Sequence, residues 1–169
     1  MDTPSRTNDR LTAFGNQLVQ VHNWLRKELA TLHDDLGSVA AGRAERLRDL
    51  RAHCLTFCSA LTTHHTGEDG GAFLVLSEKF PELRPALEEL AHDHDVVSGI
   101  LGRLEELVAG VGPGSSQAEI LHVQRELDGL TAIMETHFRY EEKRIVEALN
   151  SLDIPEWRES KPPFLLKSH

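Results

Sequence analysis

Long apolar runs, basic residues and aromatic residues are all scarce in this 169-residue chain. No stretch of about 18 apolar residues occurs, so no segment is predicted to span a membrane. Lys and Arg number 18 against 27 Asp and Glu, and the formal net charge of −9 argues against binding to nucleic-acid phosphates or to an anionic membrane. Aromatic residues make up 5% of the chain, and stretches rich in Leu, Ala, Glu and Arg favour helix over sheet.

Cysteine is also nearly absent. The two cysteines, Cys54 and Cys58, lie one helical turn apart, where they are poorly placed for a disulfide. We interpret both as small buried apolar residues. The opening residues MDTPSRTNDR lack the apolar core of a secretory signal. We therefore expect a cytoplasmic protein, monomeric or weakly dimeric.

Apolar residues recur at three- and four-residue spacing in four segments of the chain. This spacing predicts helices at about residues 8–36, 43–76, 81–109 and 118–150. Short connections between them predict an all-α, up-down-up-down four-helix bundle. The length suits a single domain, with the bundle at about 8–150 and a tail at 151–169. The proline-rich tail is expected to be irregular, with Trp157 and Phe164 able to pin it to the bundle.

Capping and helix-breaking residues set the expected ends of these helices. Thr7, Asn8 or Asp9 is the expected N-cap of the first helix, and Gly37 and Gly42 bracket the turn that follows it. The glycines within 67–71 weaken the second helix and predict a kink or local break there. The proline at position 81 marks the start of the third helix, since proline suits a first helical turn.

Several ionisable residues interrupt the apolar stripes of the third and fourth helices. His94 occupies a buried position of the third stripe, whereas His92 is turned by about 200° from it and faces outward. On the fourth helix His137 and Glu141 continue the stripe one turn apart. A buried carboxylate without a partner is costly, so these positions require paired charge or a metal.

The first and second helices carry similar residues. His22 lies inside the apolar stripe of the first helix. In the run HHTGED of the second helix, Glu68 lies near the centre of the apolar arc, and His64 and His65 flank that centre on opposite sides. Either or both of these histidines can reach inward. His53 lies at the edge of the same arc.

Counted from the loops, these residues lie at compatible depths in the bundle, to within roughly 8 Å at about 1.5 Å per residue. A single histidine in a helical stripe is more often an ordinary core residue, and for His22 alone we would favour that interpretation. Four helices that each contribute a histidine at one depth predict a metal site. Imidazole and carboxylate ligands without thiolate suit iron, manganese or zinc, and six or seven of them suit two carboxylate-bridged metals rather than one zinc ion.

This pattern resembles the hemerythrin-like (HHE) cation-binding domain, over nearly the whole chain from position 22 to about position 149. The family has a lone histidine on the first helix, His-x3-Glu on the second and fourth, and histidine on the third. The phrases HHTGED, HDHDVV and HFRYEEKRI are similar to those of the actinobacterial branch. The resemblance implies two non-haem iron ions, bridged by carboxylates and an oxo or hydroxo group. The matching residues are His22, His64 with Glu68, His94, and His137 with Glu141.

The third helix departs from the oxygen-carrying hemerythrins, which place two histidines a turn apart on it. Here the position four residues after His94 is Ser98. His65 is the expected replacement ligand and His53 the next candidate, and similar iron-sensing proteins, which carry an extra ligand beside the second-helix histidine, also favour His65. The missing histidine argues against reversible oxygen carriage.

The resemblance implies a non-haem di-iron protein that reacts with a small oxidant such as hydrogen peroxide, oxygen or nitric oxide. Similar actinobacterial proteins are thought to decompose peroxide. Two alternatives stay open: reversible oxygen binding, iron storage or sensing without turnover, and a structural bundle with zinc or no metal. Tyr140 lies beside Glu141 but is turned by about 100° from it, so packing at the rim is its simpler interpretation.

Overall fold

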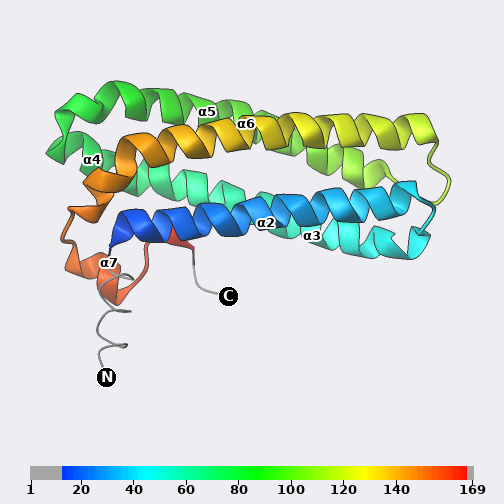
Figure 1. The fold of residues 1–169 in the computed structure, drawn as a ribbon, viewed down its shortest axis with the longest axis horizontal. Coiled ribbons are helices and arrows are strands. Elements are labelled where there is room, and N and C mark those ends of the chain that lie inside the picture. Colours follow the sequence, from blue (N-terminus) through cyan, green and yellow to red (C-terminus); the bar gives the residue numbers. More distant parts are fainter. Residues whose placement is uncertain (1–12, 167–169) are drawn as a thin grey trace.

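The computed structural model describes residues 13–166, and within this range it contains helices and connecting turns but no strand (Figure 1). The long helices are α2 (Phe14–Ala40), α3 (Leu47–Gly67), α5 (Arg84–Gly110) and α6 (Gln117–Asn150). The short ones are η1 (Ala44–Arg46), η2 (Glu68–Ala72), α4 (Phe73–Lys79), η3 (Pro81–Leu83), α7 (Pro155–Glu159) and η4 (Pro163–Leu165). The all-α bundle expected from the sequence is confirmed.

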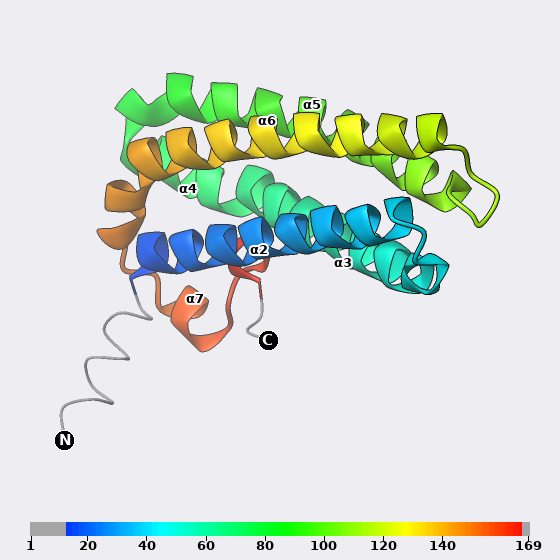
Figure 2. The ribbon, with the colours of Figure 1, turned by 45° about the vertical axis from the view of Figure 1, so that its right-hand side comes forward.

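The long helices run back and forth along one axis. In Figures 1 and 2, α2 and α3 meet at one end of the molecule, and α5 and α6 meet at the same end. Each long helix packs against two others: α2 against α3 and α6, and α5 against the same pair. None of the described helices combines the length and the apolar character that a membrane-spanning segment needs.

The first turn is tighter than the sequence predicts. Helix α2 continues through Gly37 to Ala40, and the chain reverses at Gly42, whose φ of 94° suits glycine. Only the second of the two expected turn glycines therefore ends the helix. The expected N-caps at positions 7–9 lie outside the described residues.

The expected break in the second helix is a π-helical segment. η2 (Glu68–Ala72) contains Gly70 and Gly71 and joins α3 directly to α4, which continues to Lys79, three residues beyond the predicted end. The glycines thus widen one turn without ending the helix. Single π turns inside α-helices are found frequently at functional sites.

Proline and a capping serine determine where the last two long helices begin. Pro81 opens the short helix η3 rather than α5, whose first turn contains a second proline, Pro85. The start of α6 is fixed by Ser116, whose side chain accepts a hydrogen bond from the Glu119 backbone N–H while the Glu119 carboxylate accepts one from the Ser116 N–H.

The apolar core consists of two clusters, one toward each end of the bundle. One includes Leu25, Leu61 and Phe138, and the other includes Leu18 and Leu76. Along α3, η2 and α5 the buried candidate ligands lie between residues of the two clusters, and along α2 and α6 they lie where the residues of one cluster give way to those of the other. Both cysteines are buried in the first cluster, with their sulfur atoms 4.0 Å apart and no disulfide, as interpreted from the sequence.

The tail packs along the bundle, and it is not irregular throughout as expected, because prolines open two short helices in it, α7 and η4. Phe164 is fully buried, and the ring of Trp157 lies 5.3 Å from that of Phe164 and 5.0 Å from that of Phe14. Both aromatic residues therefore pin the tail, as expected.

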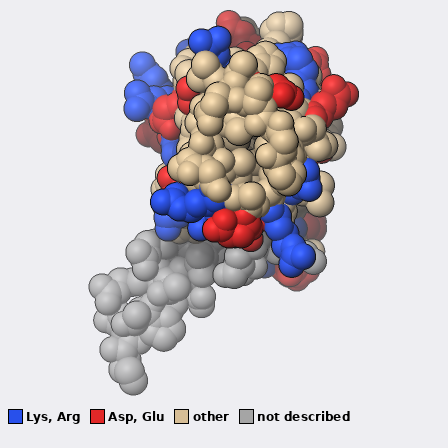
Figure 3. All heavy atoms as spheres, turned by 90° about the vertical axis from the view of Figure 1, so that its right-hand side faces the viewer, with Lys and Arg blue, Asp and Glu red and all other residues tan. Residues whose placement is uncertain are grey.

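Charges of both signs lie side by side on the end of the bundle that carries the α2–α3 and α5–α6 turns. In Figure 3 basic and acidic side chains alternate around its rim, and neither sign dominates this face. The charge distribution there offers no concentrated field to attract a strongly charged partner.

Candidate metal centre

Seven buried side chains from the four long helices and η2 converge at mid-bundle. One ligand atom from each residue lies within 4.8 Å of the others in two groups, which share Glu68. The first group is His65, Glu68, His94 and His137, and the second is His22, His64, Glu68 and Glu141. Every one of the seven principal sequence-predicted residues is therefore brought together, although they come from positions up to 119 apart in the chain.

The histidine Nε2 atoms face the two carboxylates. His94 Nε2 lies 3.2 Å from Glu68 Oε1, and His64 Nε2 lies 3.5 Å from Glu68 Oε2. Around Glu141 Oε1, the Nε2 atoms of His22 and His137 lie at 3.3 and 3.5 Å. Two ligands about 2.1 Å from one ion and at right angles would be about 3.0 Å apart, so these spacings suit shared metal ions.

The same atoms lack hydrogen-bond partners. Five imidazole nitrogens and four carboxylate oxygens of this cluster are buried and form no hydrogen bond. Buried polar atoms are nearly always satisfied, and a gathering of unsatisfied ones around two points calls for an ion. The donor set of imidazole and carboxylate fits iron, manganese or zinc.

Four of the five histidines form a hydrogen bond through Nδ1, the ring nitrogen that faces away from the centre. The acceptors for His22 and His94 are Glu142 Oε2 at 2.7 Å and Asp69 Oδ1 at 2.8 Å. For His137 the acceptor is Asp93 Oδ2 at 3.2 Å, and for His64 it is the backbone carbonyl of Phe164 at 2.5 Å. Such contacts place the proton on Nδ1 and leave the Nε2 lone pair free for a metal.

His65 differs from the other four. Its ring stacks on that of His94, with centroids 3.8 Å apart, and within the described range no acceptor holds its outer nitrogen. It nevertheless belongs to the first group, beside His94 and His137. Ser98, which stands on the third helix where a second histidine was missing, is exposed and does not belong to this group.

His53 is not brought to the cluster. Its Nδ1 lies 2.5 Å from Asp35 Oδ2, and Arg46 contacts the other oxygen of the same carboxylate at 2.9 Å. The ring is 39% exposed and pairs α3 with the end of α2. Between the two sequence candidates for the additional ligand, the geometry favours His65. His92 is exposed, as predicted.

The family model of the hemerythrin HHE cation binding domain matches residues 14–149. The chain belongs to the hemerythrin HHE family. No match was found among curated proteins or among solved structures. Because members of this family bind cations, the converging histidines and glutamates are the candidate metal centre of a hemerythrin-like domain.

Burial keeps most histidines of this hemerythrin-like centre neutral. Burial and neighbouring histidines hold the pKa values of His64 and His65 well below 6.5 and lower that of His94 to about 3. Burial also lowers the pKa of His137, although Asp93 opposes it. A neutral imidazole is the form that binds a metal, so these side chains need lose no proton at neutral pH.

His22 behaves differently. Burial lowers its pKa, but Glu141 and Glu142 outweigh burial and raise the pKa above 6.5. Glu142 is stabilised as a carboxylate, because hydrogen bonds from His22 and Arg26 overcome its own burial and lower its pKa. A metal ion on Nε2 of His22 would take the place of this proton.

Two cavities reach the hemerythrin-like centre from the surface. The smaller, of about 140 Å³, lies between α3 and α5 and exposes His65 and His94 together with hydroxyl groups. It is lined by Thr62, His65, Thr66, Asp69, His94, Asp95, Ser98 and Leu101. It touches two candidate ligands directly.

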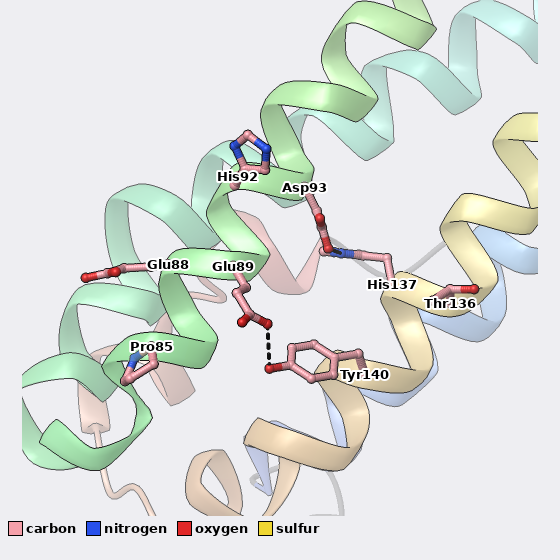
Figure 4. A pocket seen from close by; sticks show the side chains of 8 residues that line it. All are labelled: Pro85, Glu88, Glu89, His92, Asp93, Thr136, His137 and Tyr140. Atoms are coloured by element: carbon pink, nitrogen blue, oxygen red, sulfur yellow. Dashed lines mark hydrogen bonds and ion pairs between the residues drawn. The ribbon is translucent and has the colours of Figure 1, made fainter.

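The larger cavity, of about 630 Å³, lies between α5 and α6 (Figure 4). Asp93 and His137 meet on one side of it, and on another the hydroxyl of Tyr140 donates a 2.9 Å hydrogen bond to Glu89 Oε2. Tyr140 thus packs at the rim of the cavity, in agreement with the simpler interpretation of its position.

The residues that accept hydrogen bonds from Nδ1 of the histidines were not predicted from the sequence. Asp69, Asp93 and Glu142 each stand next to a candidate ligand in the chain, and that adjacency was the available signal. The fourth support, the Phe164 carbonyl, is a backbone atom and has no side-chain signature.

Proposed function

We propose that this hemerythrin-like chain holds two iron ions and uses them to decompose a small oxidant, hydrogen peroxide foremost. The observation that supports this proposal is the pair of overlapping groups of unsatisfied buried ligand atoms that share Glu68. Imidazole and carboxylate ligands in two adjoining sites suit a carboxylate-bridged iron pair.

The reaction proposed is the conversion of two peroxide molecules to two water molecules and one dioxygen. One peroxide is oxidised and the other reduced, so no further reductant is needed. The bound iron pair supplies the exchange of two electrons between them. The chain's own residues would hold the ions in place, with Glu68 shared by the two groups, Glu141 in the second group, and the histidines divided between the groups.

The small cavity between α3 and α5 favours peroxide over an apolar gas. Hydroxyl groups of Thr62, Thr66 and Ser98 line it, and it ends on His65 and His94. A volume of about 140 Å³ admits only a small molecule. A polar lining suits an oxidant that both donates and accepts hydrogen bonds.

The test combines iron per chain with oxygen release from peroxide. We expect two iron ions per chain and oxygen release above that of free iron. The variants His94→Ala and Glu141→Ala should lose both properties. His92→Ala is the matched control, since His92 lies two residues from His94 but is exposed and should leave both unchanged.

Other outcomes would assign the centre differently. A stable and reversible oxygen spectrum of the reduced protein in air, without peroxide turnover, would identify an oxygen-binding module. Iron binding without either property would favour storage or sensing. Zinc or no metal in the purified protein, and no change in metal content on His94→Ala, would overturn the di-iron proposal.

A further inference from the structure

The acceptors that hold Nδ1 of the candidate ligands follow a pattern around the bundle, in which one helix supplies the acceptor for the histidine of the next. One of the four helices supplies no such acceptor. Glu142 of α6 supports His22 of α2, and Asp93 of α5 supports a histidine of α6. Asp69 in η2, directly after α3, supports His94 of α5. By the same pattern α2 would support α3, but the acceptor behind the α3 histidine comes from the C-terminal tail.

We propose that the C-terminal segment Pro155–Leu165 is a positioning element of the metal centre. The Phe164 carbonyl fixes His64 through Nδ1, and Gly67 is the residue that permits this contact. The inference rests on the metal centre proposed above, and it adds a part of the chain that the ligand motif does not include.

His64 has no other hydrogen-bond partner in the described structure. The ring is fully buried, with Nδ1 2.5 Å from the Phe164 carbonyl oxygen and Nε2 3.5 Å from Glu68 Oε2. A carbonyl only accepts hydrogen bonds, so Nδ1 carries the proton and Nε2 presents its lone pair to the second ligand group. Without the tail the ring would lose both its orientation and the preference for this tautomer.

Backbone approaches backbone where the tail crosses α3. A Cβ atom on Gly67 would lie 2.5 Å from the Phe164 nitrogen, closer than side chains tolerate, and 3.0 Å from its Cα, so the tail backbone would have to shift. The φ and ψ of Gly67 are −65° and −36°, ordinary helical values open to any residue. Gly67 is therefore needed for the space it leaves to the tail and not for its backbone conformation.

The aromatic rings of the tail fix its position on the bundle. Phe164 is fully buried, and the Trp157 ring lies between those of Phe14 and Phe164. The support behind His64 is thus coupled to tail docking, whereas the other three histidines are supported by carboxylates on the bundle itself. Movement of the tail away from α3 would weaken the second ligand group and leave the first unchanged.

The variant Gly67→Ala tests this coupling against the matched control Gly70→Ala. A Cβ at Gly70 meets nothing within 4 Å, so both variants add a methyl group at or beside η2 but only one displaces the tail. We expect Gly67→Ala to reduce the affinity of the second group for Fe²⁺ by about 10–100-fold. The chain should then retain one ion where wild type and Gly70→Ala retain two.

A second readout does not depend on metal loading. In the metal-free wild-type protein the Nδ1–H proton of His64 should give a ¹H resonance that is protected from exchange with water. Gly67→Ala should lose this resonance while the unfolding transition remains cooperative. Phe164→Ala and Trp157→Ala loosen the tail from the other side and should have the same effects if Gly67→Ala does not fold.

The outcomes separate the two proposals. If the wild-type protein binds no metal, the proposed metal centre fails. If wild type, Gly67→Ala and Phe164→Ala all bind two ions with equal affinity and keep the His64 resonance, only the role of the tail is overturned. Equal metal loss in Gly70→Ala would also overturn it, because the effect would then belong to the π-helical segment.

Discussion

At the scale of the residue, each acid that supports a histidine stands next in sequence to a candidate ligand. Neighbouring positions on a helix are turned by about 100°, so an acid beside an inward-facing ligand points along the flank toward the next helix. There it meets the outer nitrogen of that helix's histidine. Of two consecutive residues, one is thereby a candidate ligand and the other binds the histidine of a neighbouring helix. These contacts connect all four long helices at the centre. The three acids are Asp69, Asp93 and Glu142.

The shared position of Glu68 leads to a prediction about metal content. Since Glu68 belongs to both ligand groups and His65 to one, Glu68→Ala should lose both ions and His65→Ala only one. Elemental analysis of the purified variants measures this directly. His53→Ala is the control, because its ring pairs with Asp35 away from the cluster, and it should retain both ions. Equal loss in the Glu68 and His65 variants would contradict the division into two groups.

The Asp93 support is a second residue-scale prediction. Asp93→Asn keeps the shape of the acceptor behind His137 but removes its charge, and should weaken metal binding by about 10–100-fold. Glu88→Gln removes a charge from the same cavity without contacting a ligand, so it should leave the affinity unchanged. Titration of both metal-free variants with Fe²⁺ under anaerobic conditions provides the comparison. Equal affinities would show that Asp93 contributes only general negative charge.

The inward-facing ligands could be predicted from sequence, but most of their supports could not. His94 and His137 interrupt a regular apolar stripe, and helical periodicity alone fixes their direction. The direction of the His65 ring depended on the exact course of α3, which periodicity does not resolve for a residue at the flank. The support from Phe164 joins positions 100 residues apart through a backbone oxygen, and no pattern in the chain encodes it.

At the scale of the element, the second helix does not end at its glycines, because a π-helical segment, η2, joins α3 directly to α4. Glycine at positions 70 and 71 weakens regular helix, but the chain stays helical because both flanks are buried, at Leu61 before the segment and at Leu76 after it. The existence of each long helix could therefore be predicted from the apolar stripes, whereas that of the short helices in the tail could not. The helix ends could not, since they depend on details such as the positive φ of Gly42.

The crossing of α2 and α6 yields an element-scale prediction. A Cβ atom on Gly15 would lie 2.2 Å from the Val146 carbonyl oxygen and 2.7 Å from Asn150 Oδ1, so the helices meet there without room for a side chain. Gly15→Ala should destabilise the fold by about 1–3 kcal/mol, although alanine is the better helix former.

Gly129→Ala on α6 is the control for this prediction. A Cβ at Gly129 meets nothing within 4 Å, and the substitution should stabilise the fold by up to about 1 kcal/mol. Urea unfolding of both variants gives the sign of each effect. Stabilisation by Gly15→Ala would show that the two helices can separate at little cost.

At the scale of the whole molecule, the ionisable centre separates the two apolar clusters and makes the metal-free fold sensitive to pH. Burial lowers the pKa values of His64, His65, His94 and His137 in the folded state, whereas the unfolded chain returns them to about 6.5. Below pH 6.5 the unfolded chain therefore binds protons that the folded chain does not.

The free energy of unfolding of the metal-free protein should consequently fall as the pH is lowered from 7.5 to 5.5. Each histidine that stays neutral in the folded state contributes a loss of roughly 1.4 kcal/mol over this interval. His22 and Asp69 act in the opposite direction, because their pKa values are raised in the folded state, that of Asp69 to about 6 by burial, but two such groups do not offset four. For His94, whose pKa is lowered to about 3, the loss continues through the whole acid range down to that value.

Urea unfolding of the metal-free protein at several pH values measures this slope, and two variants assign it. The slope of the unfolding free energy against pH reports the number of protons taken up on unfolding, and His94→Asn should reduce this number by about one. The reason is that the asparagine side chain does not titrate. His92→Asn changes an exposed ring and should leave the slope as it is. A stability that stays constant or rises on acidification would mean that the buried histidines take up protons without unfolding. The bundle would then have to open at its centre and admit water to the cluster, which would contradict the dry arrangement of unsatisfied ligands on which the metal proposal rests.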